Sequence, residues 1–282
     1  MGGGLSSSAA FELALLHALL LMNDISLSPA ERIMLAHDAE SKYVGLSCGY
    51  LDQGTIELAD KCALVIHHRP YGNEKFAGVP LPMDLEGKYV LIGGFAPKKD
   101  HKLAQSGYNE RRAACESALP VLRDILGEHV HYLGDVSFGE FLWNEKKIRE
   151  RLGKHSRTAD YLSYIVGENH RVLLFQIAAK QRDWEAIPRL FSDTLECSLE
   201  RFDIGDPDGG LKFLSSFVQR EFPRAGVQNI GGGWSPTTAA FVPSEQAEEY
   251  RQKVSSEFAK RFHVEYRTFK AEGGVPSAGI IT

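Results

Sequence analysis

The stretch GGGLSSSAA at residues 2–10 stands in front of an apolar helical pattern and is the strongest indicator of the fold. The apolar residues that follow at helical spacing are Phe11, Ala14, Leu15, Ala18, Leu19 and Met22. This pattern predicts a glycine-serine loop that opens a buried helix. Such a helix start can bind phosphate, because its backbone N–H groups are unpaired and lie at the positive end of the helix dipole. A loop that only caps the helix is an alternative that these residues leave open.

Two carboxylates follow this loop at positions suited to phosphoryl transfer. Ser28 and Pro29 predict the start of a second helix that runs to about Gly45 and carries Glu40 near its end. The segment CGYLDQ at residues 48–53 then places Asp52 at the start of a short helix. One carboxylate could hold a metal ion while the other accepts a proton from an attacking hydroxyl. A helix cap at Asp52 and a solvent-facing Glu40 are the structural alternatives.

The rest of the chain alternates between helical and strand-like patterns, which predicts an α+β fold. Strands are expected at 63–66 and 89–92, followed by a mainly helical region at 108–184. After Pro223 the order is a strand near Val227, a turn at 231–233, a strand at 237–242, a helix at 244–262 and a strand at 264–269. These last elements suggest a βαβ-type layer. A weak boundary near residue 95 divides the chain into domains at 1–95 and 96–282, and Trp143 and Trp184 are expected in the core.

Composition excludes several classes of protein. The net charge of -5 argues against a nucleic-acid binder, which usually carries a basic excess on one face. The four cysteines are far apart in the sequence, so neither a zinc site nor a disulfide framework is indicated. The apolar stretch from Leu13 to Met22 is too short to cross a membrane. We therefore expect a cytoplasmic protein.

Several motifs in this chain closely resemble those of galactokinases, a branch of the GHMP kinases. Residues 3–9, GGLSSSA, then Glu40, then residues 48–53, CGYLDQ, match the order and spacing of the family's GGGLSSSA and PCGxMDQ motifs. Later segments also resemble family motifs: YNERR at 108–112, GENHRV at 167–172 and GGGW at 231–234. The resemblance covers almost the whole chain.

The resemblance implies a role for each matching residue. The residues implied to line the phosphates of ATP are Gly3, Gly4, Ser6, Ser7 and Ser8. Ser8 and Glu40 would also lie at Mg²⁺, and Asp52 would be the base or orienting carboxylate at the sugar hydroxyl. Gly49 and Tyr108 would lie against the sugar, and the glycines at 231–233 would lie near the nucleotide.

The resemblance also implies a fold and an activity. The fold is a two-lobed α+β kinase, with a front lobe similar to a ribosomal-protein β-α-β fold and a ferredoxin-like rear lobe. The activity is transfer of the γ-phosphoryl group of ATP to the anomeric hydroxyl of galactose or a related monosaccharide, with Mg²⁺ as cofactor.

Three departures from the family pattern suggest an alternative. The sugar-binding motif that precedes the phosphate loop in the family is absent, so we expect an N-terminally truncated or divergent member with incomplete sugar recognition. Ser235 and Pro236 replace a glycine-rich pair, and Asp100 stands where many relatives have an arginine that Lys99 would replace only partly. A catalytically degenerate sugar- and nucleotide-binding protein is therefore the second hypothesis. Retention of Glu40 and Asp52 favours the enzyme.

Overall fold

A computed structural model describes most of the chain, and its backbone forms helices and antiparallel sheets. The described residues are 6–59, 62–67, 77–85, 87–97, 107–233 and 235–271. They divide into two compact units, and the boundary in the sequence falls between Asp84 and Leu85. The strand at Tyr89–Phe95 belongs to the second unit, because it is hydrogen-bonded into the sheet of that unit. The α+β class is confirmed, while the division into domains at 1–95 and 96–282 stays a prediction.

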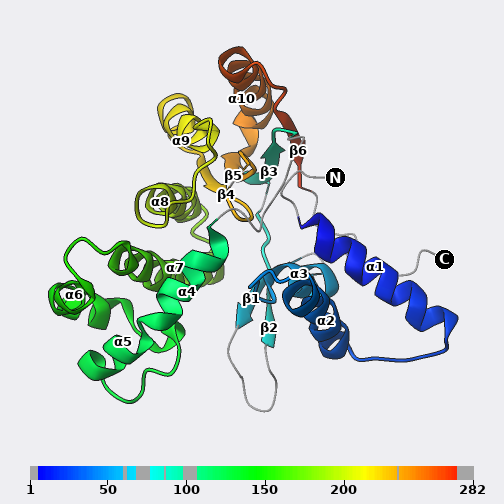
Figure 1. Cartoon of the computed structure of the whole chain (residues 1–282). Coiled ribbons are helices and arrows are strands. Elements are labelled where there is room, and N and C mark those ends of the chain that lie inside the picture. Colours follow the sequence, from blue (N-terminus) through cyan, green and yellow to red (C-terminus); the bar gives the residue numbers. More distant parts are fainter. Residues whose placement is uncertain are drawn as a thin grey trace. The chain divides into compact units, whose positions relative to one another are not determined.

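Helices make up most of the described part of the first unit (Figure 1). They are α1 (Ser7–Met22), α2 (Pro29–Asp38) and α3 (Leu51–Leu58), and a π-helical segment at Ala39–Tyr43 extends α2. Ser28 caps α2 in a capping box with Glu31, and this confirms the helix start predicted from Ser28 and Pro29. The short helix that ends at Leu58 is confirmed as well.

We predicted that the apolar residues from Phe11 to Met22 form a buried face of α1, and this prediction is wrong. Phe11 is 66% exposed, and Leu15, Leu19 and Met22 are exposed with it, whereas Ala9 and Leu13 are buried. The helix is apolar almost all the way round, so its sequence period does not show which side meets α2 and α3. Among the described residues, no helix is long and apolar enough to cross a membrane.

A buried ionic cluster ties the three helices of the first unit together. Glu57 on α3 has a side chain that is only 3% exposed. One of its carboxylate oxygens accepts a 2.6 Å hydrogen bond from Nε of Arg32 on α2, and the other lies 3.0 Å from Nε2 of His17 on α1. Because a buried carboxylate is stable only when it is paired, this cluster fixes the three helices at one point.

A two-stranded hairpin completes the first unit. β1 (Ala63–His67) pairs antiparallel with β2 (Ala77–Leu81), with Ala63 opposite Leu81. Ile66 of β1 packs against Gly54 of α3, where any side chain would be crowded. The predicted strand at 63–66 is therefore confirmed, and it packs on the helix that carries Asp52.

The helical region of the second unit has its own apolar core. Its helices are α4 (Tyr108–Ser117), α5 (Leu119–Leu126), α6 (Phe138–Leu152) and α7 (Arg157–Gln181), with a short 3-10 turn at Leu133–Asp135. Leu122, Phe141, Ile148 and Leu162 are fully buried between these helices. Trp184 is buried as predicted, but Trp143 is 89% exposed. Trp143 lies two residues after Phe141 on the same helix, which places it on the opposite face from the core.

The second unit also contains a four-stranded antiparallel sheet. Its strands are β3 (Tyr89–Phe95), β4 (Gly226–Asn229), β5 (Thr238–Pro243) and β6 (Arg267–Lys270), in the order β4-β5-β3-β6. β5 and β6 both pair antiparallel with β3, so they run parallel to each other with β3 between them. The unit β5-α10-β6, with α10 at Ala247–Phe262, is therefore the split form of the predicted βαβ layer.

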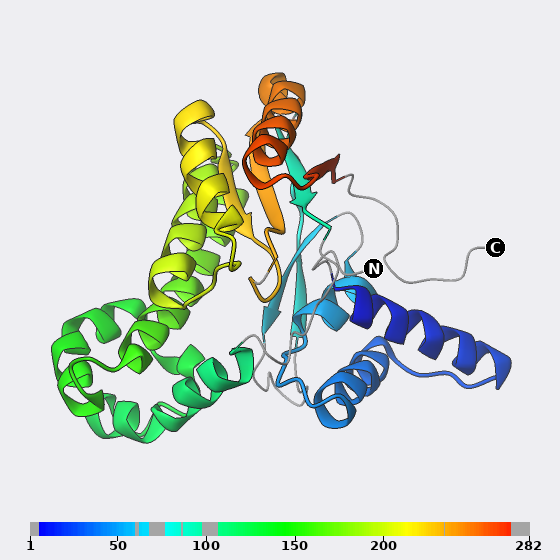
Figure 2. The ribbon, with the colours of Figure 1, turned by 45° about the horizontal axis from the view of Figure 1, so that its top comes forward.

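Helices pack on the two faces of this sheet (Figure 2). Val242 and Ala240 point into a core shared with α9 (Gly210–Glu221) and α10. Phe241, between them on β5, stacks on Tyr89 with ring centroids 5.0 Å apart and lies 6.0 Å from the ring of Phe191 on α8 (Ala186–Arg201). Neighbouring residues of β5 thus take part in different contacts, because side chains alternate along a strand, and α8 also contributes Leu195 to the core of Val242 and Ala240.

Close packing of α8 on β4 makes Gly226 sensitive to substitution. A Cβ atom on Gly226 would lie 1.8 Å from the carbonyl oxygen of Pro188, which belongs to the backbone of α8 and cannot rotate away. We expect Gly226→Ala to lower the free energy of unfolding by roughly 2–3 kcal/mol through overpacking. Urea unfolding followed by tryptophan fluorescence measures this, since the described tryptophans Trp143 and Trp184 belong to the second unit.

The same substitution at Gly139 is the matched control. Gly139 lies in the first turn of α6, and a Cβ atom there would meet nothing within 4 Å. Gly139→Ala should leave stability unchanged or raise it by up to about 1 kcal/mol, because alanine favours the helix. Equal unfolding midpoints for the two variants would contradict the packing argument.

Candidate active site

The serine run lies at the start of α1, as predicted. Ser6 is the N-cap residue with a left-handed φ of 53°, and the helix from Ser7 extends for 16 residues, more than three turns. Ser6 makes no side-chain cap bond to the helix, and its hydroxyl instead donates to the Asp52 carboxylate. Ser6 therefore leaves the first N–H groups of the helix for another acceptor. The predicted phosphate-binding residues Gly3 and Gly4 lie outside the described residues.

Glu40 is held in the first unit by donors from α1 and α3. It lies in the π-helical segment, where Val44 N donates to Ala39 O over 3.2 Å and the backbone widens. Such π-turns occur often at functional sites. Glu40 is 7% exposed, its Oε1 accepts a 2.7 Å bond from Ser8 Oγ, and its Oε2 accepts a 2.7 Å bond from Gln53 Nε2. The solvent-facing alternative for Glu40 is excluded.

Asp52 lies in the first turn of α3 in the same group of side chains. Burial raises its pKa, the hydrogen bond from Ser6 partly opposes this rise, and the charge of Glu40 adds to it. Burial and the charge of Glu40 likewise raise the pKa of Glu12 on α1. Burial first, and then Glu40, raise the pKa of the Cys48 thiol to about 11, so this cysteine stays protonated and unreactive at neutral pH.

The charge balance of this site favours a bound cation. Glu12 and Asp52 each lie within electrostatic reach of Glu40, and within the described ranges no lysine or arginine is among the causes of the shifts at Glu12 and Asp52. The described residues contain no group of three His, Cys, Asp or Glu side chains that could enclose a metal ion. Mg²⁺ needs no such cage, since one or two carboxylates together with phosphate oxygens and water satisfy it. The oxygen atoms of Ser8 and Glu40 fit that donor set.

The loop between Glu40 and Asp52 is anchored by His37, a residue that the sequence did not single out. His37 Nε2 lies 3.2 Å from the carbonyl oxygen of Cys48, and its ring lies over Tyr50 with centroids 4.2 Å apart. Gly49, a predicted sugar contact, lies between these two anchored residues. His37 is four positions after Ile33, which is buried, so the pattern of α2 indicated only that this face was covered.

The structure brings some of the predicted residues together and leaves others in the second unit. In the first unit Ser8 is hydrogen-bonded to Glu40, and both Ser6 and Glu40 act on the pKa of Asp52. Tyr108 is the first residue of α4 in the second unit, and the residue before it, Gly107, has a φ of 68°. The roles assigned to all of these residues stay predictions.

The late glycine-rich segment is the turn between β4 and β5 in the second unit. Ile230 N donates to Thr237 O over 2.9 Å and closes this turn. Gly233 has a φ of 79°, and a Cβ atom there would lie 2.0 Å from Ile204. Ser235 and Pro236, which depart from the family pattern, are buried in this unit. Asp100 and Lys99, the other departure, lie outside the described residues.

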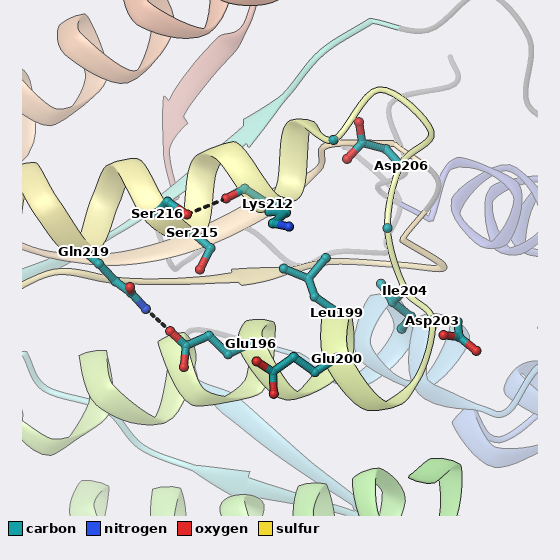
Figure 3. Close-up of a pocket in the computed structure, with 12 residues that line it drawn as sticks. Glu196, Leu199, Glu200, Asp203, Ile204, Asp206, Lys212, Ser215, Ser216 and Gln219 are labelled. Carbon is teal, nitrogen blue, oxygen red and sulfur yellow. Dashed lines mark hydrogen bonds between the residues drawn. The ribbon is translucent and has the colours of Figure 1, made fainter. Parts of the chain in front are cut away.

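A separate hollow of about 620 Å³ lies in the second unit between α8 and α9 (Figure 3). Leu199 and Ile204 form its apolar wall, and Glu200 and Lys212 face it from opposite helices. Asp206 also lines the hollow, and its two oxygens accept bonds from the backbone N–H groups of Gly210 and Leu211 at the start of α9. The hollow contains none of the predicted site residues.

The raised pKa of Asp52 predicts a pH-dependent change in stability. The carboxylate form is disfavoured in the folded chain, so an ionised Asp52 costs stability above its folded pKa, and the cost vanishes below its unfolded pKa. Without Mg²⁺, Asp52→Asn should therefore be more stable than the parent chain at pH 7.5, and this difference should disappear near pH 3.5. Urea midpoints at the two pH values test this, and a destabilised variant at pH 7.5 would show that the carboxylate is favourably paired.

Comparisons with known proteins place the chain among sugar kinases. Residues 1–59 match the family model described as GHMP kinases N terminal domain. The galactokinase of Thermococcus kodakarensis is 31% identical over 264 residues, which cover 93% of this chain and 67% of that enzyme. The galactokinase of Clostridium tetani is 30% identical over 262 residues, or 92% of this chain and 62% of the relative. The chain thus spans about two thirds of the length of these relatives.

A solved structure shows the same fold. The crystal structure of Lactococcus lactis galactokinase with galactose superposes on this chain with a TM-score of 0.82 at 22% identity. The superposition covers 97% of this chain. This likeness confirms the predicted GHMP-kinase architecture. Together with the shared sequence of the Thermococcus enzyme, it shows that the chain belongs to the galactokinase branch of the GHMP kinase family.

Proposed function

We propose that this chain transfers the γ-phosphoryl group of ATP to the anomeric hydroxyl of galactose or a related monosaccharide. The observation that carries the proposal is the 2.7 Å hydrogen bond between Ser8, in the first turn of α1, and Glu40. The charge of Glu40 in turn acts on Asp52. A phosphate-binding helix start, an oxygen pair suited to a metal and a carboxylate suited to a base therefore occur together in one unit. A cytoplasmic location remains part of this proposal.

Each of these groups has one task in the reaction. The first backbone N–H groups of α1 would bind the phosphates of ATP, since the helix dipole favours negative charge there. Ser8 and Glu40 would hold Mg²⁺, which when bound neutralises charge on the phosphates. The Ser8 hydroxyl would reach the metal through an oxygen lone pair, which leaves its proton free to donate to Glu40.

Asp52 is the residue that we assign to the sugar hydroxyl. Its pKa is raised by burial, and an acid with a raised pKa holds a transferred proton better than an exposed aspartate does. The hydroxyl of Ser6 donates to the same carboxylate and would orient it toward the substrate. A raised pKa would therefore help Asp52 to hold the proton of the sugar hydroxyl. The same burial disfavours the ionised carboxylate when no substrate is bound.

A degenerate binding protein is the second candidate, and one structural observation favours it. Pro236 is buried against Gly210 of α9, where added bulk would be crowded, so this turn lacks the backbone freedom of a glycine-rich loop. ADP release measured with a panel of monosaccharides, beside ATP binding without turnover, separates the two candidates. Sugar-dependent ADP release supports the kinase, and nucleotide binding without release for any sugar supports the binding protein.

Asp52→Asn should separate chemistry from nucleotide binding. We expect kcat to fall by at least about 100-fold, because the variant removes the proton acceptor. The affinity for ATP should change by less than about threefold, because the helix start and Glu40 are untouched. Steady-state kinetics with galactose and calorimetric titration with a non-hydrolysable ATP analogue measure the two effects.

Asp124→Asn is the matched control for this experiment. Asp124 lies on α5, is exposed, and pairs with Arg151 on α6 over 2.9 Å. Removing this surface pair should change kcat by less than about twofold, because exposed pairs of this kind contribute little. If Asp52→Asn behaves like Asp124→Asn, Asp52 does not take part in phosphoryl transfer.

A further inference from the structure

Gln53 lies beside the site without a role in the proposed reaction, yet it is the most buried polar side chain there. It is 0% exposed, and its Nε2 atom donates a 2.7 Å hydrogen bond to Glu40 Oε2. The carboxylate of Glu12 on α1 lies nearby, since both Glu40 and Gln53 act on its pKa, and its Oε2 atom is buried without a hydrogen-bond partner among the described residues. A single amide group therefore donates to Glu40 close to a second carboxylate.

The chemistry of an amide explains why glutamine suits this position. The NH₂ group has two hydrogens and can serve two acceptors, whereas a glutamate in the same place would add a third carboxylate. The oxygen Oε1 of Gln53 is buried without a hydrogen-bond partner. The reverse orientation of the amide would place this oxygen against Glu40 and Glu12, so the two carboxylates fix which way the amide points.

Gln53 also connects the elements that form the site. Ser8 and Glu12 lie one turn apart on the same face of α1, Glu40 lies on the π-helical segment, and Gln53 follows Asp52 on α3. Glu40 is thereby held from both sides, with Ser8 on Oε1 and Gln53 on Oε2. On Oε2 the bond from Gln53 is the short one, since the other donor to this oxygen, the thiol of Cys48, lies 3.8 Å away.

We propose that Gln53 is a positioning residue: its amide holds Glu40 in the orientation that presents a carboxylate oxygen to the metal of the nucleotide complex. The inference rests on the proposed function, because it takes Glu40 as a metal ligand. Gln53 itself contacts neither metal nor substrate in this account. Its effect is exerted through the carboxylate of Glu40.

The test measures nucleotide binding on the full chain across a range of Mg²⁺ concentrations. Gln53→Met fills a similar volume without a donor, and Gln53→Leu is a smaller apolar replacement without a donor, so either can be used if the other folds poorly. Calorimetric titration with ADP gives the Mg²⁺ concentration at which half of the metal-dependent gain in affinity is reached, and we call this concentration the Mg²⁺ midpoint. We expect this concentration to rise by about 10-fold or more, as is typical when a group that orients a metal ligand is lost. Affinity for ADP without metal should stay within about twofold of the parent.

Glu57→Gln is the control for a merely structural effect. Glu57 lies on the same helix, is almost fully buried, and bonds to Arg32 and His17 rather than to Glu40. This variant should lower the unfolding midpoint and leave the Mg²⁺ midpoint unchanged. An unchanged Mg²⁺ midpoint in the Gln53 variants, or an equal shift in Glu57→Gln, would overturn the inference.

Binding rather than turnover is measured, so this inference and the proposed function can fail separately. A chain that transfers no phosphoryl group, but whose Mg²⁺-dependent ADP binding weakens in Gln53→Met, overturns the proposed kinase activity and supports the role of Gln53. Sugar-dependent turnover with an unchanged Mg²⁺ midpoint in both Gln53 variants supports the kinase and overturns the role of Gln53. A parent chain whose ADP binding does not respond to Mg²⁺ overturns the inference as well.

Discussion

The buried carboxylate of Glu40 is the constraint on which the first unit depends. A carboxylate that is 7% exposed requires hydrogen-bond donors, and here they come from Ser8 on α1 and Gln53 on α3. The need to satisfy one charge therefore brings together segments that are 32 and 13 residues away in the chain. The start of α1 and the start of α3 converge on Glu40 for this reason.

A second buried carboxylate supports this arrangement from farther along the same helices. Glu57 pairs with Arg32 and His17 and ties α1, α2 and α3 together. The two carboxylates differ in kind, because Glu57 meets cationic or imidazole partners whereas Glu40 meets neutral donors. A carboxylate held by neutral donors keeps its negative charge uncompensated and remains able to attract a cation. The structural carboxylate and the functional one are thus distinguished by their partners.

The concentration of negative charge at Glu40 has consequences for stability and for function. Glu12 and Asp52 each have a raised pKa, in which burial is the largest cause and Glu40 contributes. The folded chain therefore carries an electrostatic cost that a bound cation would relieve. Sites of this kind are expected where function needs a charge distribution that the fold alone would not favour.

Local sequence determined much of the fold and part of the site. Ser28, Pro29 and Glu31 determine the start of α2, and the serine run marks the start of α1, because capping and helix spacing depend on neighbours within a few residues. The motif order from Ser6 to Asp52 identified the family and the candidate carboxylates. Only the tertiary structure decided which face of α1 is covered, because that helix is apolar on nearly every side. It also decided that Gln53 and Glu12 share the site with Glu40, and that β3 lies between β5 and β6. These choices depend on contacts between residues distant in the chain, and a local pattern carries no information about which distant partner satisfies a buried charge or a strand edge.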